Sequence, residues 1–235
     1  MDLQKVFAKD FHENEFEKEK SMKKIIAVNA GPRKNWNTAQ LINAACEGAK
    51  EEGAEVKVYN MYDLEKYSGC ISCFGCKLEK NLGHCICKDG LTPVLEDIRT
   101  ADGLIIGSPN YLSDVTAAFR AIYERLIFQY ITYKKEQRSY NDRQIPVLFI
   151  MTSNAPDAAY EEGGMYDGLI KRYQGTFSGI IGPTKVVLAA DTKQVNNYDI
   201  YNWTMFDVEH KIARHEEVFG TKLEEAKAIG KEMAQ

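Results

Sequence analysis

The sequence predicts a doubly wound α/β fold, in which helices cover both faces of a five-stranded parallel sheet with strand order 2-1-3-4-5. Short apolar runs rich in Ile and Val alternate with stretches of helical period along residues 23–190. The runs are apolar throughout, which is typical of parallel strands buried on both faces. Several runs end in glycine, proline and small polar residues. In such sheets, ligands bind at these carboxyl ends of the strands.

Each expected strand is a short apolar run that ends at a turn signal. The five runs are 23–29, 55–60, 103–108, 145–151 and 184–190. Each expected helix has an apolar face of helical period, and the five helices are 38–53, 91–103, 115–130, 165–178 and 204–234. Five such strand–helix units are the number that a flavodoxin-like sheet requires.

The domain organisation is expected to be simple. Residues 23–235 are predicted to form one domain with a cysteine-rich loop at 68–90, because no linker or repeat interrupts the pattern. An arm precedes it over residues 1–22, where three phenylalanines recur among charged neighbours. Such an arm is either a solvated helix or a segment that packs across a partner subunit.

Composition narrows the class of protein. The chain has 235 residues, of which 44% are hydrophobic and 27% are charged, and its net charge is −4. A large core is therefore available, while the absence of a clustered basic face argues against nucleic acid as a partner. No apolar stretch is long enough to span a membrane, and the N-terminus lacks an apolar signal core. We therefore expect a cytoplasmic protein.

The loop after the first expected strand has the composition of an anion site. Residues 30–38 read AGPRKNWNT, in which Gly31 shapes the turn and Arg33 adds positive charge. Thr38 is expected to be the N-cap of the next helix, and its hydroxyl with neighbouring backbone N–H groups could instead hold a phosphate. The residues alone leave open whether this is a phosphate loop or an ordinary capped turn.

Two further loops reach the same sheet edge. Residues 107–120, GSPNYLSDVTAAFR, offer backbone amides and the aromatic face of Tyr111. Residues 151–156, MTSNAP, offer the polar side chains of Ser153 and Asn154. Because the carboxyl ends of parallel strands share one edge, these loops are expected to line one ligand site.

A cluster of cysteines follows the second expected strand. Five of the six cysteines fall within 18 residues, at positions 70, 73, 76, 85 and 87. In a reducing compartment this spacing favours a metal or redox site over a disulfide scaffold. Three interpretations stay open: a [4Fe–4S] cluster, thiols that pack or undergo redox chemistry, and zinc. Cys46 lies in a helical pattern and is expected to be a small buried hydrophobe.

Residues 25–42, IIAVNAGPRKNWNTAQLI, resemble the first loop of the NADPH-dependent FMN reductase and iron-sulfur flavoprotein group, whose pattern is roughly GSPRKxGNT. The resemblance implies that Asn37 and Thr38 cradle the FMN phosphate and that Arg33 is the arginine of that loop. Gly31 stands in place of a serine and Trp36 in place of a glycine. The tryptophan puts the loop conformation in question, since glycine takes φ angles that tryptophan avoids.

The same resemblance assigns the other loops. It implies flavin contacts from the second and third loops by Pro109, Asn110, Tyr111, Leu112, Ser153 and Asn154. The compact cysteine motif also matches, which implies that the four cluster ligands are Cys70, Cys73, Cys76 and Cys85. Cys87 is extra, and related reductases keep several such cysteines without a cluster. Arg120 and Arg125, in the expected helix 115–130, are interpreted as surface or subunit-interface residues.

The resemblance implies an FMN-dependent oxidoreductase. The protein would take electrons from NAD(P)H and pass them to a small-molecule or protein acceptor, through a [4Fe–4S] cluster if one is bound close to the flavin. No side chain is expected to act as a general acid or base, because the cofactor performs this chemistry. The alternatives are a non-enzymatic electron carrier and a metal-dependent sensor. A homodimer or homotetramer is expected.

Overall fold

The computed structural model describes residues 22–235 and contains a five-stranded sheet in the order β2-β1-β3-β4-β5. Its strands are β1 (Lys24–Asn29), β2 (Glu55–Asn60), β3 (Gly103–Pro109), β4 (Val147–Thr152) and β5 (Thr184–Ala189). All four neighbouring pairs are parallel. The predicted fold class and strand order are confirmed.

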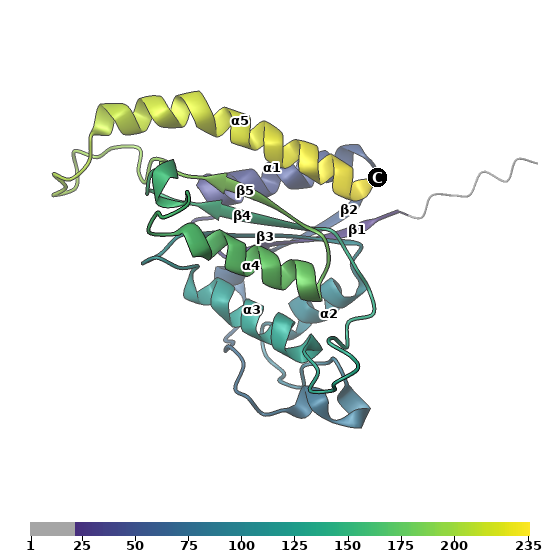
Figure 1. The fold of residues 1–235 in the computed structure, drawn as a ribbon. Helices are drawn as coiled ribbons and strands as arrows, with labels where there is room; N and C mark the ends of the chain where they lie inside the picture. The colour runs from purple at the N-terminus through teal and green to yellow at the C-terminus, as the bar shows by residue number, and fades with distance from the viewer. Residues whose placement is uncertain (1–21) are drawn as a thin grey trace, which may run out of the picture.

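Five α-helices cover the two faces of the sheet. They are α1 (Asn37–Glu51), α2 (Thr92–Thr100), α3 (Ala117–Tyr130), α4 (Asp167–Ile180) and α5 (Val208–Ala234). Figure 1 shows α1 and α5 on one face and α2, α3 and α4 on the other. Each strand is therefore joined to the next parallel strand by a helical crossover, as such sheets require.

The core forms two layers because neighbouring side chains of a strand point to opposite faces. In β1, Ile26 and Val28 join the cluster under α2, α3 and α4, whereas Ile25 and Ala27 join the cluster under α1 and α5. The central strands are almost entirely buried, while β2 at the edge is largely exposed. Burial on both faces explains why the central runs are apolar throughout.

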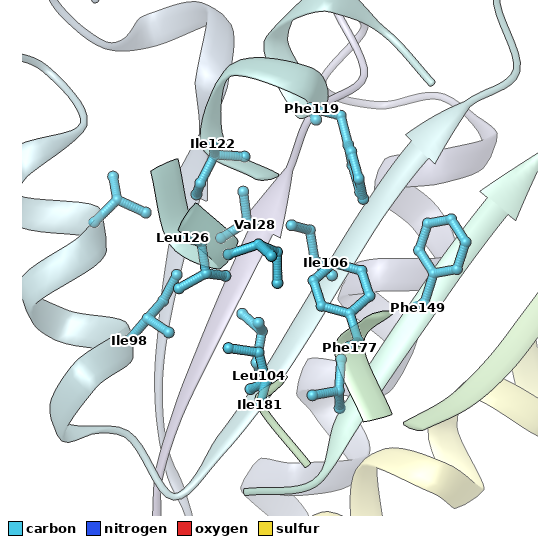
Figure 2. Close-up of a cluster of buried hydrophobic side chains, with 14 of the residues drawn as sticks. Val28, Ile98, Leu104, Ile106, Phe119, Ile122, Leu126, Phe149, Phe177 and Ile181 are labelled. Carbon is cyan, nitrogen blue, oxygen red and sulfur yellow. The ribbon is translucent and has the colours of Figure 1, made fainter. Parts of the chain in front are cut away.

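Aromatic side chains dominate one part of the larger core layer. Phe119 of α3 packs against Phe149 of β4, and both contact Phe177 of α4 (Figure 2). Tyr173 completes the group, with its ring edge-to-face on Phe119 at a centroid separation of 5.5 Å. These tilted and edge-to-face contacts add to the free energy of burial and hold α3 and α4 against β4.

The arm predicted for residues 1–22 falls almost entirely outside the described residues. The domain boundary at residue 23 therefore stays a prediction. Within residues 22–235, no helix combines the length and apolar character needed to cross a bilayer.

The close contact between α1 and α5 depends on two glycines. A Cβ atom on Gly230 would lie 1.9 Å from the carbonyl oxygen of Ala45, and one on Gly48 would lie 2.0 Å from that of Lys227. Both carbonyl oxygens belong to the backbone, so neither can move away by a change of side-chain rotamer. The two helices pack this closely because each presents a glycine to the backbone of the other.

We predict that Gly230→Ala lowers the free energy of unfolding by about 1–3 kcal/mol, because the methyl group forces the helices apart. Gly220→Ala is the matched control. It lies in the same helix with no atom within 4 Å of the added Cβ, so it should stabilise by up to about 1 kcal/mol. Urea unfolding of both variants measures the difference, and equal midpoints would contradict the packing argument.

Candidate functional site

A cleft lies at the carboxyl edge of the sheet, where the loops after β1, β3, β4 and β5 meet. The cleft is open to solvent, and its interior volume is about 90 Å³. Nine of the ten residues predicted to bind the cofactor line it: Gly31, Arg33, Asn37, Thr38, Pro109, Asn110, Tyr111, Ser153 and Asn154. The tenth, Leu112, is fully exposed and is not part of the lining.

Helix α1 begins one residue earlier than expected, which corrects the prediction that Thr38 is its N-cap. Trp36 occupies the N-cap position, and its side chain makes no capping hydrogen bond. The Thr38 hydroxyl lies 2.7 Å from that of Thr152, because the end of β4 supplies a buried partner. Uncapped N–H groups at the start of α1 therefore border the cleft, an arrangement that attracts anions.

Arg33 brings positive charge to this end of the cleft. Its guanidinium stacks over the Trp36 ring, 4.6 Å from the centroid, and donates a hydrogen bond to the Gln194 carbonyl at 2.5 Å. Partial burial lowers the pKa of Arg33, because it penalises the charged form. An anionic ligand in the cleft would offset that penalty.

The loop after β3 supplies an aromatic wall and a fixed amide. Asn110 donates from its side chain to the Tyr160 hydroxyl at 2.6 Å, and its backbone N–H donates to the Thr152 carbonyl. Tyr111 is 47% exposed, so one face of its ring is free at the rim of the cleft. The next residue, Leu112, adopts a φ of 50° within the tight turn. The loop thus presents Tyr111, while Leu112 remains in solvent.

Two polar atoms of residues that line the cleft are buried without a hydrogen-bond partner within residues 22–235. They are the indole Nε1 of Trp36, a donor, and the side-chain oxygen Oδ1 of Asn154, an acceptor. A buried polar group without a partner costs free energy, so each marks a place where a ligand or an ordered water completes the site. The cleft therefore fits a ligand with an anionic end and a polar ring edge.

A buried ion pair behind the cleft holds the β4 and β5 loops together. Lys211 of α5 pairs with Asp191 after β5 and donates to the Asn154 carbonyl at 2.6 Å. His210 lies 2.9 Å from the other oxygen of Asp191, whose backbone has a φ of 51°. Sequence reasoning missed these residues, because no local motif links α5 to a loop that lies about 20 positions earlier or to the β4 loop.

Two opposed effects set the protonation of Asp191. Burial alone would raise the pKa of this carboxyl, but the hydrogen bonds from Lys211 and His210 outweigh it, so that the pKa lies below its ordinary value. A carboxyl with a lowered pKa stabilises the folded state above the unfolded-state pKa of about 3.9. That contribution is lost as the pH falls through the lower, folded-state pKa.

The cysteines line a second, smaller cavity, whose interior volume is about 20 Å³. All five cysteines of the motif border it, together with apolar side chains such as Ile86 and Phe128. Burial raises the pKa of both the Cys76 and the Cys87 thiol. In the described part of the chain, no three or more His, Cys, Asp or Glu side chains are arranged as a site for a single metal ion.

Arg125 anchors the cysteine loop, which corrects its interpretation as a surface or interface residue. It is only 2% exposed, and its guanidinium pairs with Asp89 at 2.6 Å. Its Nε donates to the Cys85 sulfur at 3.3 Å, and Nη2 donates to the Cys87 carbonyl. Arg125 is interpreted from the sequence as a surface or interface residue of the expected helix, but the cysteine loop packs over it and buries it.

Two more residues join the loop to α3. Gln129 accepts a hydrogen bond from the Cys85 backbone N–H at 3.1 Å, while its own Nε2 is buried without a partner among the described residues. Lys77 donates to carbonyl groups at the C-terminal end of α3, including that of Ile131 at 2.6 Å. The side-chain NH₂ group of Gln129 thus leaves two N–H donors at the edge of the cysteine cavity.

The sequence predicted that the cysteine site lies close to the loops expected to bind the flavin. Within one chain, the cysteine cavity instead lies away from these loops. The cavity is lined by Phe128 and Gln129 in the last turn of α3, whereas the cleft is lined by Pro109 and Asn110, which precede that helix. The two sites share no lining residue. Figure 1 shows the segment after β2 turning away from the sheet edge and passing beneath α3.

Residues 23–159 match the family model of the NADPH-dependent FMN reductases. The chain belongs to this family. The predicted resemblance is thereby confirmed, and the family supports FMN as a cofactor. The matched segment contains the first three strands and β4, and therefore the loops that contribute most of the cleft residues.

Several curated relatives are named iron-sulfur flavoproteins. The chain is 34% identical over 102 residues to one from Methanocaldococcus jannaschii, covering 43% of this chain and 51% of the relative. It is 31% identical over 104 residues to one from Methanosarcina thermophila, covering 44% and 52%. The chain thus spans about half the length of the curated relatives it matches.

Solved structures share the fold at low sequence identity. An NAD(P)H:quinone oxidoreductase from Methanothermobacter marburgensis aligns over 90% of this chain and 98% of its own, with a TM-score of 0.66 and 14% identity. An FMN-dependent NADH-azoreductase from Bacillus anthracis aligns over 91% and 100%, with a TM-score of 0.64 and 14% identity. These similarities support the flavodoxin-like fold.

We predict that Lys211→Met lowers the free energy of unfolding at pH 7 by about 3–5 kcal/mol, because it leaves a buried carboxylate without its partner. The wild type should lose stability below about pH 4 as Asp191 is protonated. The variant should lose less free energy of unfolding below about pH 4 than the wild type, since burial without Lys211 favours the neutral carboxyl of Asp191. Urea unfolding of both proteins at pH 7 and below pH 4 measures this difference.

Arg214→Met provides the matched control for this experiment. Arg214 pairs with Asp157, whose side chain is half exposed, so its removal should cost no more than about 1 kcal/mol. A loss of stability in Lys211→Met no larger than in Arg214→Met would contradict the importance of the buried pair.

Proposed function

We propose that this protein is an FMN-dependent oxidoreductase that takes electrons from NAD(P)H and passes them to a small-molecule or protein acceptor. The observation that carries the proposal is the cleft itself. An uncapped helix N-terminus and an arginine lie at one end, while an aromatic ring and an acceptor without a partner lie along its wall. These are the groups that a phosphate and a planar polar ring require.

In this proposal the phosphate binds at the start of α1. Backbone N–H groups near Asn37 and Thr38 donate to it, and the Arg33 guanidinium neutralises its charge. The Asn37 side chain donates to the Lys193 carbonyl at 3.0 Å, which fixes the β5 loop against this turn. The helix terminus contributes up to about 2 kcal/mol toward an anion in a partly buried position.

The flavin ring would lie between the β3 and β4 loops. Pro109, Asn110 and Tyr111 border it on one side, and Ser153 and Asn154 provide polar groups on the other. The Oδ1 atom of Asn154 would accept a hydrogen bond from the polar edge of the ring. Leu112 is left out of this proposal, because its side chain points into solvent.

When bound, FMN supplies the redox chemistry, accepting a hydride from the nicotinamide and giving up electrons to the acceptor. The chain's own residues bind and orient the ring and leave a route to it. Because Tyr111 is half exposed at the rim, a second planar molecule has access to the cleft. No side chain is assigned a role as general acid or base.

We further propose that Cys70, Cys73, Cys76 and Cys85 hold a [4Fe–4S] cluster. The second cavity brings these thiols around one apolar space, and thiolates are the usual ligands of such clusters. The Nε2 of Gln129 and the Nε of Arg125 supply N–H donors beside the sulfurs. Donors of this kind tune the reduction potential of a cluster.

A homodimer or homotetramer also belongs to the proposal. Within one chain the cleft and the cysteine cavity lie at opposite ends of α3. Direct transfer between flavin and cluster therefore favours an assembly in which the cavity of one subunit approaches the cleft of another. Sedimentation of the purified protein would measure the number of subunits.

We predict that the purified protein binds FMN and that NADH or NADPH bleaches the flavin absorbance. Stopped-flow mixing with each coenzyme under nitrogen measures the rate. Continued coenzyme consumption with an artificial acceptor would support the reductase. FMN that binds but is reduced by neither coenzyme would support an electron carrier instead, and failure to bind FMN would overturn the proposal.

We predict about four iron and four sulfide per chain in protein prepared without oxygen. Cys73→Ala should remove the cluster absorbance and leave FMN bound, because Cys73 lines only the second cavity. Cys46→Ala is the matched control, since Cys46 is buried between α1 and the sheet, away from that cavity. Cys87→Ala should also retain the cluster. Iron-free protein after assembly in vitro, or zinc in its place, would contradict the cluster.

A further inference from the structure

We propose that Trp36 is a phosphate-recognition residue of the cleft, which holds the Arg33 guanidinium in place and offers its own indole N–H to the same phosphate. This rests on the proposed binding of FMN and identifies a residue that departs from the family pattern. The two departures from the family pattern, at Gly31 and Trp36, then compensate for one another. One removes a hydroxyl donor from the loop, and the other adds an N–H donor.

The backbone at Trp36 does not require glycine. Its φ is −109° and its ψ is −178°, an extended conformation that any residue adopts. Tryptophan in place of glycine is therefore compatible with the backbone conformation of this loop. As the N-cap residue of α1, Trp36 lies directly before the backbone N–H groups that border the cleft.

The stacking contact restrains a long and flexible cation. The Arg33 guanidinium lies 4.6 Å from the Trp36 ring centroid. Within residues 22–235, its one hydrogen bond goes to the Gln194 carbonyl. Its remaining N–H donors are thus available to a ligand, and the ring reduces the entropy lost when they bind it.

The indole N–H is the second contribution. Nε1 of Trp36 is buried and has no hydrogen-bond partner among the described residues, and the residue lines the cleft. Indole nitrogen can only donate, so the matching ligand group is an acceptor. With Arg33 and the helix terminus beside it, an anionic oxygen satisfies all three groups, and the phosphate of FMN supplies such oxygens.

Comparison of FMN with riboflavin isolates this role, because riboflavin carries the same ring without the phosphate. Fluorescence titration should show that Trp36→Leu weakens FMN binding about 10-fold or more, the loss expected for contacts to a charged group. The riboflavin affinity of the variant should stay within about 2-fold of that of the wild type, because riboflavin has no phosphate to contact Trp36. Trp36→Phe keeps an aromatic face without the donor and should lie between wild type and Trp36→Leu.

Trp203→Phe is the matched control, because it makes the same chemical change at the other tryptophan, which does not line the cleft. Both ligands should bind this variant as they bind the wild type. Circular dichroism spectra and melting temperatures should confirm that every variant is folded.

A double-mutant cycle tests whether Trp36 acts together with Arg33. Trp36→Leu should cost much less FMN affinity in an Arg33→Leu background than in the wild type, because the two residues share one ligand group. Unchanged FMN affinity in Trp36→Leu, an equal loss for riboflavin, or fully additive losses would each overturn the inference. Wild-type protein that binds no FMN would instead overturn the proposed function.

Discussion

The structure depends on one constraint, which is that parallel strands can be joined only by crossovers that return to the starting edge. Every strand of this sheet therefore ends at the same edge, and the loops after β1, β3, β4 and β5 converge there. Burial of β1, β3 and β4 on both faces makes that arrangement rigid. The sheet therefore determines where the cleft lies, and a few loop residues determine its chemistry.

The loops are held by polar contacts between segments that are distant in the sequence. Thr38 meets Thr152 through their hydroxyls, and Lys211 joins the Asn154 carbonyl to Asp191. Such buried contacts cost desolvation unless every member is paired. The Oδ1 atom of Asn154 has no hydrogen-bond partner within the described residues, although the carbonyl of the same residue is held by Lys211.

The cysteine loop is held in place by side chains of two long cationic residues and not by the sheet. It has little regular structure, and its position depends on Arg125 and Lys77, which bind backbone and side-chain acceptors around the end of α3. Burying a guanidinium is costly, and the pairing with Asp89 offsets that cost. The loop is thus fixed to the helix that leads away from the cleft, which separates the two sites within one chain.

The sequence by itself determined the strands, their order and nine of the residues that line the cleft, because apolar runs and loop motifs are local patterns and the topology brings the loops together. Only the tertiary structure decided the capping of α1, the burial of Arg125, the role of Lys211 and the direction of the cysteine loop. Each of these depends on a partner far away in the chain. Periodicity and spacing describe neighbours along the chain, whereas a buried polar group is placed by whatever packs against it in space.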